Sequence, residues 1–166
     1  MITIPTPSMA LNSPDVFGYS MSNTRVVASD VTPYWLANNV AAVAVGSGGK
    51  LAALIFQCHG FVNNGVFAGL DMGTGIDYAD LRHFSQLKNL VDAIYIGACR
   101  AASGSHGKRF CGELARRTQA IVYAADRDQQ TFGGDLQAAL RGGVIDDFEG
   151  QVFKFDKSGH PQPVNL

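Results

Sequence analysis

The sequence predicts an α/β fold with a mostly parallel central sheet, and three observations support this prediction. Short apolar or β-branched runs alternate with segments of helical periodicity along the 166 residues. Hydrophobic residues make up 46% of the chain and charged residues only 16%, which favours a well-buried core over disorder. Two apolar runs, 51–58 and 91–98, are nearly continuous, as in strands covered on both faces. We therefore expect a parallel sheet with helices on both faces.

The first half of the chain predicts an arm followed by alternating strands and helices. Residues 1–22 are rich in Pro, Ser, Asn and Gly, so we expect a loosely held arm ahead of a single domain over 23–166. The β-branched run TRVVA predicts a strand over 24–28. Pro33, preceded by the possible capping residues Asp30 and Thr32, predicts a helix over 34–45.

The middle of the chain predicts a buried strand, turns and a second helix. The run LAALIFQC, bounded by glycine on both sides, predicts a strand over 51–58. Repeated glycines over 60–75 predict turns. Apolar residues that recur every three to four positions predict a helix over 77–90.

The second half predicts two more strands of the sheet and a terminal hairpin. VDAIYIGA predicts a central strand over 91–98. A loop over 103–107 and a helix over 109–118 are expected to lead into the strand AIVYAA over 120–125. The remaining expected elements are a short helix over 135–140 and a C-terminal hairpin within 149–164.

Composition and charge disfavour several classes of protein. The net charge is −1 and no basic run interleaves with aromatic residues, so we expect no nucleic-acid partner. The apolar runs are much shorter than the roughly 20 residues of a membrane-spanning helix, so we expect no membrane partner. Three cysteines do not suggest a disulfide framework, and the N-terminus does not resemble a secretory signal. We expect a cytoplasmic protein, or one exported without a cleaved signal peptide; its oligomeric state stays open.

Two chemically reactive residues directly follow the two apolar strands. His59 follows the strand over 51–58, and Cys99 follows the strand over 91–98. Because parallel strands end at the same edge of a sheet, the thiol and a histidine base are expected to meet there. Gly60 lets the backbone approach a substrate carbonyl, so its N–H and that of Cys99 are the expected oxyanion-hole donors. The sequence thus predicts a Cys–His dyad for acyl transfer.

The motifs around this pair carry a more specific likeness. CHG at 58–60, the following glycine-rich turn and GACRAA at 97–102 resemble the caspase-like superfamily of cysteine peptidases. The resemblance implies a three-layer caspase-like sandwich and cleavage of a protein or peptide substrate without a metal or organic cofactor. It implies that His59 is the general base or acid, Cys99 the nucleophile and Gly60 the oxyanion-hole glycine.

The same resemblance suggests where substrate specificity arises. Gly97 stands where caspases have Gln and metacaspases an acidic residue, both of which line the substrate pocket. Asp126 and Asp128 follow the strand over 120–125, in a region that shapes the pocket of related peptidases. They are therefore candidates for the pocket, and Asp126 for recognising a basic residue, although a solvated loop charge is an equally good interpretation.

Alternative functions remain open from the sequence alone. The fold could serve as a non-catalytic interaction module, or the same dyad could perform amidase or transpeptidase chemistry. A zinc site formed by cysteines and histidines is disfavoured because no C-x₂-C or H-x₃-H spacing exists. The residues considered for that site are Cys58, His59, Cys99, His106 and Cys111.

Overall fold

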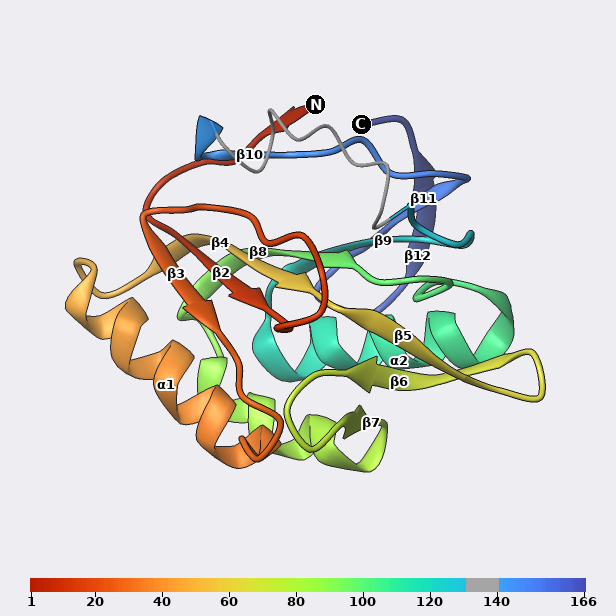
Figure 1. Ribbon diagram of the computed structural model, residues 1–166, viewed down its shortest axis with the longest axis horizontal. Coiled ribbons are helices and arrows are strands. Elements are labelled where there is room, and N and C mark those ends of the chain that lie inside the picture. Colours follow the sequence, from red (N-terminus) through yellow and green to blue (C-terminus); the bar gives the residue numbers. More distant parts are fainter. Residues whose placement is uncertain (131–140) are drawn as a thin grey trace.

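A seven-stranded mixed sheet forms the centre of the computed structural model, which describes residues 1–130 and 141–166 (Figure 1). The strand order is β12-β11-β9-β8-β4-β2-β3. The strands are β2 (Ser8–Asn12), β3 (Asn23–Val26), β4 (Leu51–Gln57), β8 (Val91–Gly97), β9 (Ile121–Ala125), β11 (Val152–Phe155) and β12 (Pro161–Val164). The strands from β3 to β9 pair in parallel, whereas β11 and β12 add antiparallel pairs at one edge. The predicted α/β class and the C-terminal hairpin are confirmed.

The two central strands, β4 and β8, have the continuous apolar sequences that their position requires. They pair in parallel from Leu51 with Val91 to Gln57 with Gly97. Alternate residues of β4 reach both cores, because Leu54 belongs to the core on the helical side and Ile55 to the core on the opposite side. Burial on both faces explains why these strands lack an alternating polar pattern.

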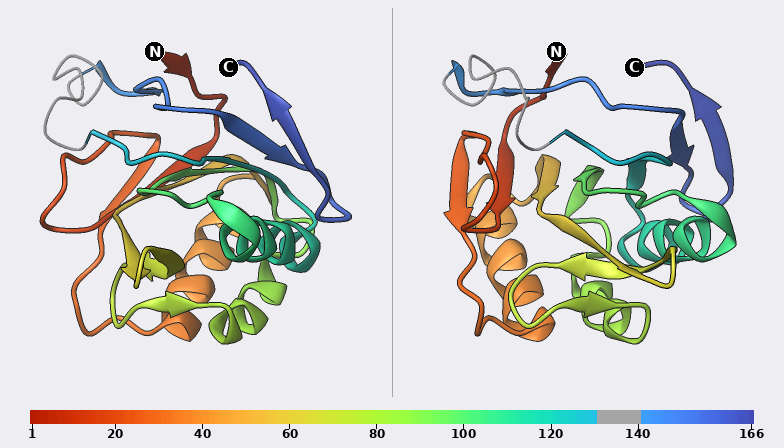
Figure 2. Two further views of the ribbon diagram at one scale, coloured as in Figure 1. Left: turned by 90° about the vertical axis from the view of Figure 1, so that its right-hand side faces the viewer. Right: turned by 45° about the vertical axis from the view of Figure 1, so that its right-hand side comes forward.

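The three described helices all pack on one face of the sheet (Figure 2). They are α1 (Pro33–Gly46), the 3₁₀ helix η1 (Ala79–Leu87) and α2 (Gly104–Thr118). Helix α1 begins as expected, because the Thr32 hydroxyl accepts a hydrogen bond from the N–H of Trp35 at 3.3 Å. Helix α2 begins earlier than predicted, so the expected loop over 103–107 is wrong. None of the described helices is long and apolar enough to cross a membrane.

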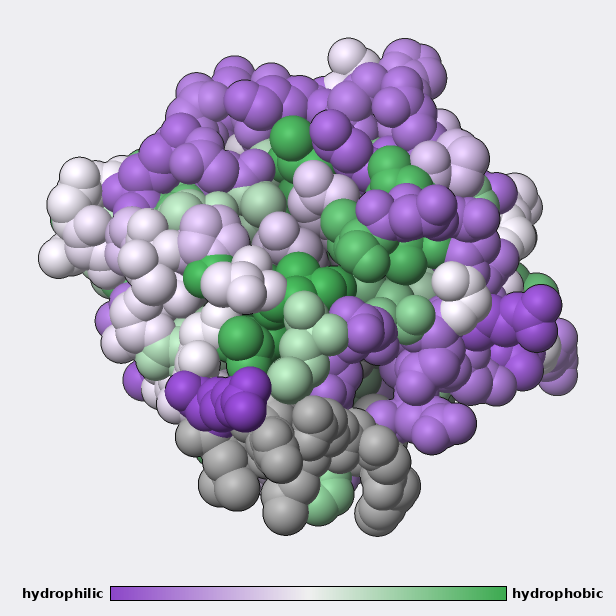
Figure 3. All heavy atoms as spheres, turned by 90° about the horizontal axis from the view of Figure 1, so that it is seen from above, coloured by the Kyte–Doolittle hydropathy of each residue, from purple (hydrophilic) through white to green (hydrophobic). Residues whose placement is uncertain are grey.

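The opposite face of the sheet is covered by extended segments in the described part of the chain. The short strands β1 (Ile2–Thr3) and β10 (Val144–Ile145) pair with each other above this face. Ile4, Met21 and Ile145 pack here against the sheet. Figure 3 shows this side from above, with hydrophobic residues near its middle and hydrophilic residues along much of its border. Helices on both faces are thus not found in the described residues, and the helix expected over 135–140 lies outside them.

The N-terminal segment is not the loosely held arm that its composition predicted. Strand β2 lies between β3 and β4, and all five of its residues are buried. Met9 and Leu11 enter the core on the helical side, and Ala10 the core on the other side. The polar residues around this short apolar run dominate the composition of residues 1–22, so composition gives no sign of the strand. The prediction of a loose arm is therefore wrong for residues 8–12.

The glycine-rich stretch after β4 forms a second, three-stranded antiparallel sheet. Its strands are β5 (His59–Asn63), β6 (Val66–Asp71) and β7 (Ile76–Asp77). Asn64 and Gly65 connect the first two strands with φ values of 49° and 78°, the left-handed conformation that an Asn-Gly hairpin turn uses. Phe67 packs edge to face on Phe110 of α2 with ring centroids 5.3 Å apart, which attaches this sheet to the core. The prediction of turns alone over 60–75 is therefore wrong, because β5 and β6 form a hairpin there.

Candidate functional site

His59 and Cys99 lie beyond matching ends of two neighbouring parallel strands. Gln57 of β4 pairs with Gly97 of β8, and each reactive residue stands two positions further along its chain. The backbone segments that follow the two strands are in direct contact at this point. A Cβ atom built on Gly60 would lie only 2.1 Å from the carbonyl oxygen of Cys99. The structure therefore places the His-Gly and Ala-Cys motifs side by side at the carboxyl edge of the sheet.

Cys99 is the accessible thiol of this protein. Its side chain is partly exposed, whereas Cys58 and Cys111 are fully buried. Burial raises the pKa of both buried thiols, and for Cys58 the nearby carboxylates Asp71 and Asp15 raise it further. Cys99 is thus the one cysteine that is partly exposed, while the other two thiols stay protonated inside the core.

His59 has a carboxylate partner that the sequence did not reveal. Its Nε2 atom lies 3.3 Å from Oδ2 of Asp15, which follows strand β2. The Nδ1 atom has no hydrogen-bond partner among the described residues. A nucleophile, a base and a group that orients the base are the parts of a catalytic triad. Asp15 was missed because it lies in the segment expected to be a loose arm.

The backbone of Gln129 contacts the thiol directly. Its N–H donates to the sulfur of Cys99 at 3.3 Å, and the Cys99 thiol lies 3.6 Å from its carbonyl oxygen. The segment that carries Gln129 is held by Arg100, which donates to both carboxylate oxygens of Asp128 at 2.7 and 3.0 Å. These hydrogen bonds from Arg100 hold the pKa of Asp128 below its usual range. Asp128 therefore anchors the chain beside Cys99.

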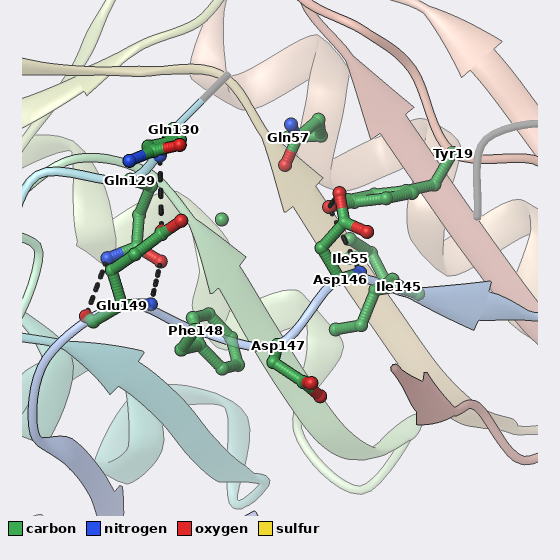
Figure 4. A pocket seen from close by; sticks show the side chains of 11 residues that line it. Tyr19, Ile55, Gln57, Gln129, Gln130, Ile145, Asp146, Asp147, Phe148 and Glu149 are labelled. Carbon is green, nitrogen blue, oxygen red and sulfur yellow. Dashed lines mark hydrogen bonds between the residues drawn. The ribbon is translucent and has the colours of Figure 1, made fainter. Parts of the chain in front are cut away.

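A pocket opens beside these groups, on the face of the sheet away from the helices (Figure 4). Gly97, one of the three candidates for a substrate pocket, lines it. A Cβ atom on Gly97 would lie 2.2 Å from Oε1 of Gln57, so glycine leaves room for that amide. Its other lining residues include Tyr19, Gln57, Gln129, Asp146 and Glu149.

Asp126 and Asp128, the other two expected pocket residues, lie outside this pocket. Both line a separate, more open depression of the surface. The Asp126 carboxylate accepts a hydrogen bond from the N–H of Gln151 at 2.9 Å, which joins the loop after β9 to the start of β11. Of the three pocket candidates, the structure brings Gly97 to the pocket and gives the two carboxylates roles in holding loops.

Gln57 and Asp146 line the pocket but were not among the residues predicted from the sequence. Gln57 is the last residue of β4 and lines the pocket together with Ile55, as alternation along the strand requires, but nothing in the sequence marks that face as a pocket. Asp146 belongs to a stretch with no recognisable motif and comes to the site only through the tertiary fold. His106, considered as a possible metal ligand, lies on α2 and lines a different depression with Tyr78.

The described residues contain no group of three His, Cys, Asp or Glu side chains placed to hold a metal ion.

Comparison with known proteins does not assign the chain to a family. No protein-family model matches the chain. No curated protein matches it either, so the interpretation of the site rests on its own geometry and chemistry.

Proposed function

We propose that this chain is a cysteine peptidase of the caspase-like type, with the three-layer architecture of that superfamily and with Cys99 as nucleophile and His59 as proton carrier. The observation that supports it best is the contact between Gly60 and the backbone of Cys99 at matching ends of β4 and β8. Acyl transfer requires a thiol, a base and converging backbone donors in one place. These residue types occur together here beside an open pocket.

The first half of the proposed reaction forms a thioester. His59 takes the proton of the Cys99 thiol, and the sulfur attacks the carbonyl carbon of the scissile amide. The N–H groups of Gly60 and Cys99 stabilise the negative charge that develops on the carbonyl oxygen. His59 then gives its proton to the amine, which leaves as the carbon–nitrogen bond breaks.

The second half regenerates the enzyme. His59 takes a proton from a water molecule, and the resulting hydroxide attacks the thioester carbonyl. The carbon–sulfur bond breaks, the acid leaves and Cys99 recovers its proton from His59. Asp15 keeps the imidazole oriented throughout, and these steps need no metal or organic cofactor.

Cleavage of a peptide library by wild type and Cys99→Ala tests this proposal. We expect cleavage by wild type, no cleavage by Cys99→Ala or His59→Ala, and unchanged circular dichroism for both. Cys111→Ala is the matched control, because it removes a buried thiol of α2 that lies outside the site. Cleavage that persists in Cys99→Ala would reject the mechanism. Hydrolysis of simple amides or esters in place of peptides would instead assign another acyl-transfer reaction to the same dyad.

A variant of Asp15 tests the orienting role separately. We expect Asp15→Asn to lower kcat about tenfold with little change in KM, because an exposed carboxylate positions the base and does not touch the substrate. Asp30→Asn is a control with the same chemistry at an exposed site before α1. Equal kcat for Asp15→Asn and wild type would remove Asp15 from the mechanism.

A further inference from the structure

A different pocket from that in Figure 4 lies on the small sheet of β5, β6 and β7. Its lining includes Phe61 of β5, Gly69 and Asp71 of β6, and Asp77 of β7. We call it the hairpin pocket. Asp71 is also the cross-strand partner of His59. The hairpin pocket therefore adjoins the candidate site on the side of the proposed base.

The register of the small sheet puts the hairpin pocket on the face that carries the imidazole. His59 pairs with Asp71. Phe61 pairs with Gly69, which pairs in turn with Asp77. Residues directly opposite each other on antiparallel strands project to the same face, and so do residues two positions apart on one strand. The side chains of His59 and Phe61 therefore point to the same side, with their Cα atoms roughly 7 Å apart.

Phe61 presents an aromatic ring to the hairpin pocket. This residue is 56% exposed, and its partner across the sheet, Gly69, has no side chain that could cover the ring. Two aromatic rings attract each other in offset-stacked or edge-to-face arrangements by more than the burial of apolar area alone provides. An open ring beside a cavity is thus a stacking surface for a second ring.

The size and the rim of the hairpin pocket limit what can enter it. Its volume of about 310 Å³ is roughly ten times the 30 Å³ that one water molecule occupies in the liquid, which leaves room for one large side chain. On the rim, Asp77 and Asp80 each accept a hydrogen bond at 3.0 Å from the N–H of the other. These bonds fix two negative charges, which repel an acidic side chain and attract the positively polarised edge of an aromatic ring.

We propose that the hairpin pocket binds the side chain of an aromatic residue directly after the scissile bond. In the proposed reaction His59 gives its proton to the leaving amine, so the residue that carries this amine lies against His59. Its side chain must extend roughly 7 Å along β5 to reach Phe61, which favours a large one. The ring stacks on Phe61 with its edge toward Asp77. This inference rests on the proposed peptidase function and names a class of substrate for it.

Binding of product-like peptides to wild type tests the hairpin pocket without any catalysis. The probes are four peptide amides, X-Gly-Ala-Gly, in which X carries the free amine and is Phe, Leu, Lys or Asp. Nuclear magnetic resonance titration gives the Kd, with the backbone N–H groups of Gly69 and Asp77 as reporters. We expect the Phe peptide to bind about three- to tenfold more tightly than the Leu peptide, because an aromatic pair adds this much to apolar burial.

The other probes decide between ligand classes. The Asp peptide should bind most weakly, since its carboxylate meets the charges of the rim. Tightest binding of the Lys peptide would overturn the proposal and make the hairpin pocket a cation site. Equal binding of all four peptides, tightest binding of the Leu or Asp peptide, or no binding at millimolar concentration would also overturn it.

Three substitutions assign the preference to the ring of Phe61. Phe61→Leu keeps an apolar side chain and should reduce the preference for the Phe peptide to less than about twofold, whereas Phe61→Tyr keeps the ring and should retain the preference. Trp35→Leu is the matched control, because Trp35 is a similarly exposed aromatic residue on α1, at 61%. Circular dichroism checks the fold of each variant. Full preference in Phe61→Leu, or its loss in Trp35→Leu, would overturn the assignment.

Cleavage by wild type separates this inference from the proposed function. The substrates are peptides that differ only in the residue after the scissile bond. Fastest cleavage before Phe, Tyr or Trp, together with preferred binding of the Phe peptide, supports both. Cleavage without such a preference, together with equal binding, keeps the peptidase and rejects the aromatic pocket. No cleavage of any peptide, together with preferred binding of the Phe peptide, rejects the peptidase and keeps the pocket.

Discussion

Replacing Gly60 with alanine tests the close approach on which the candidate site depends. The new Cβ would lie 2.1 Å from the carbonyl oxygen and 3.3 Å from the nitrogen of Cys99. Both atoms belong to the backbone, so no side-chain rotation relieves the clash. Since non-bonded heavy atoms prefer separations of about 3.5–4.0 Å, the backbone segments at Gly60 and Cys99 must move apart by about 1 Å or more. The substitution therefore separates His59 from Cys99 without altering either side chain.

The size of the effect follows from this displacement. A misplacement of about 1 Å between catalytic groups can cost roughly a hundredfold in rate, so we expect kcat/KM to fall by about that factor. Overpacking of this kind costs about 1–3 kcal/mol, which lowers Tm by roughly 2–12 °C in a chain of this length. The assay is peptide cleavage, with scanning calorimetry on the same samples.

A matched control separates the clash from a general effect of alanine. Gly46 ends α1, and a Cβ atom there meets nothing within 4 Å. Gly46→Ala should therefore keep the activity of wild type and should not lower the Tm, since alanine favours a helix more than glycine does. Full activity and an unchanged Tm in Gly60→Ala would refute the reasoning, because Gly60 could then not lie against the backbone of Cys99.

Three further predictions concern the thiols, an ion pair and the buried N-terminal strand. In the native protein we expect iodoacetamide to alkylate Cys99 first, with mass spectrometry showing slow reaction at the buried thiols Cys58 and Cys111. The pKa of Asp128 is lowered by Arg100, so its stabilising contribution is full above the ordinary carboxyl range and lost as the pH falls through the lowered pKa. A carboxyl ¹³C titration should give a midpoint below that of a model aspartate, and Arg100→Gln should restore the ordinary value; equal midpoints would contradict this. Leu11→Ala should lower the free energy of unfolding in urea by about 2–5 kcal/mol, against less than about 0.5 kcal/mol for exposed Val26→Ala. Similar losses for both would show that β2 is not part of the core.

Local patterns were sufficient for the central strands and for the start of α1. A strand covered on both faces is apolar along most of its length, as β4 and β8 are apart from Gln57 and Asp92, so both can be recognised without knowledge of their neighbours. A helix start has its own signal, because Thr32 and Pro33 satisfy requirements of the first turn alone. These elements could be predicted because their physical causes lie within a few residues of sequence.

The missed elements depend on partners that are distant in the chain. Strand β2 is stable because β3 and β4 pair with it on both sides, and its five residues contain no signal of either neighbour. The hairpin of β5 and β6 holds Phe67 against α2, a contact that no local pattern reveals. Tertiary packing decides such cases, because short segments have little conformational preference of their own.

The sequence alone determined which residues can react and that two of them follow apolar strands. Only the tertiary structure decided that Gly60 touches Cys99, that Asp15 reaches His59 and that Asp146 and Gln57 line one pocket. The physical reason is that chemical type is a property of each residue, whereas distance is a property of the whole fold. Parallel pairing of β4 with β8 brings residues 40 positions apart into contact, because two adjacent parallel strands in register end at the same edge.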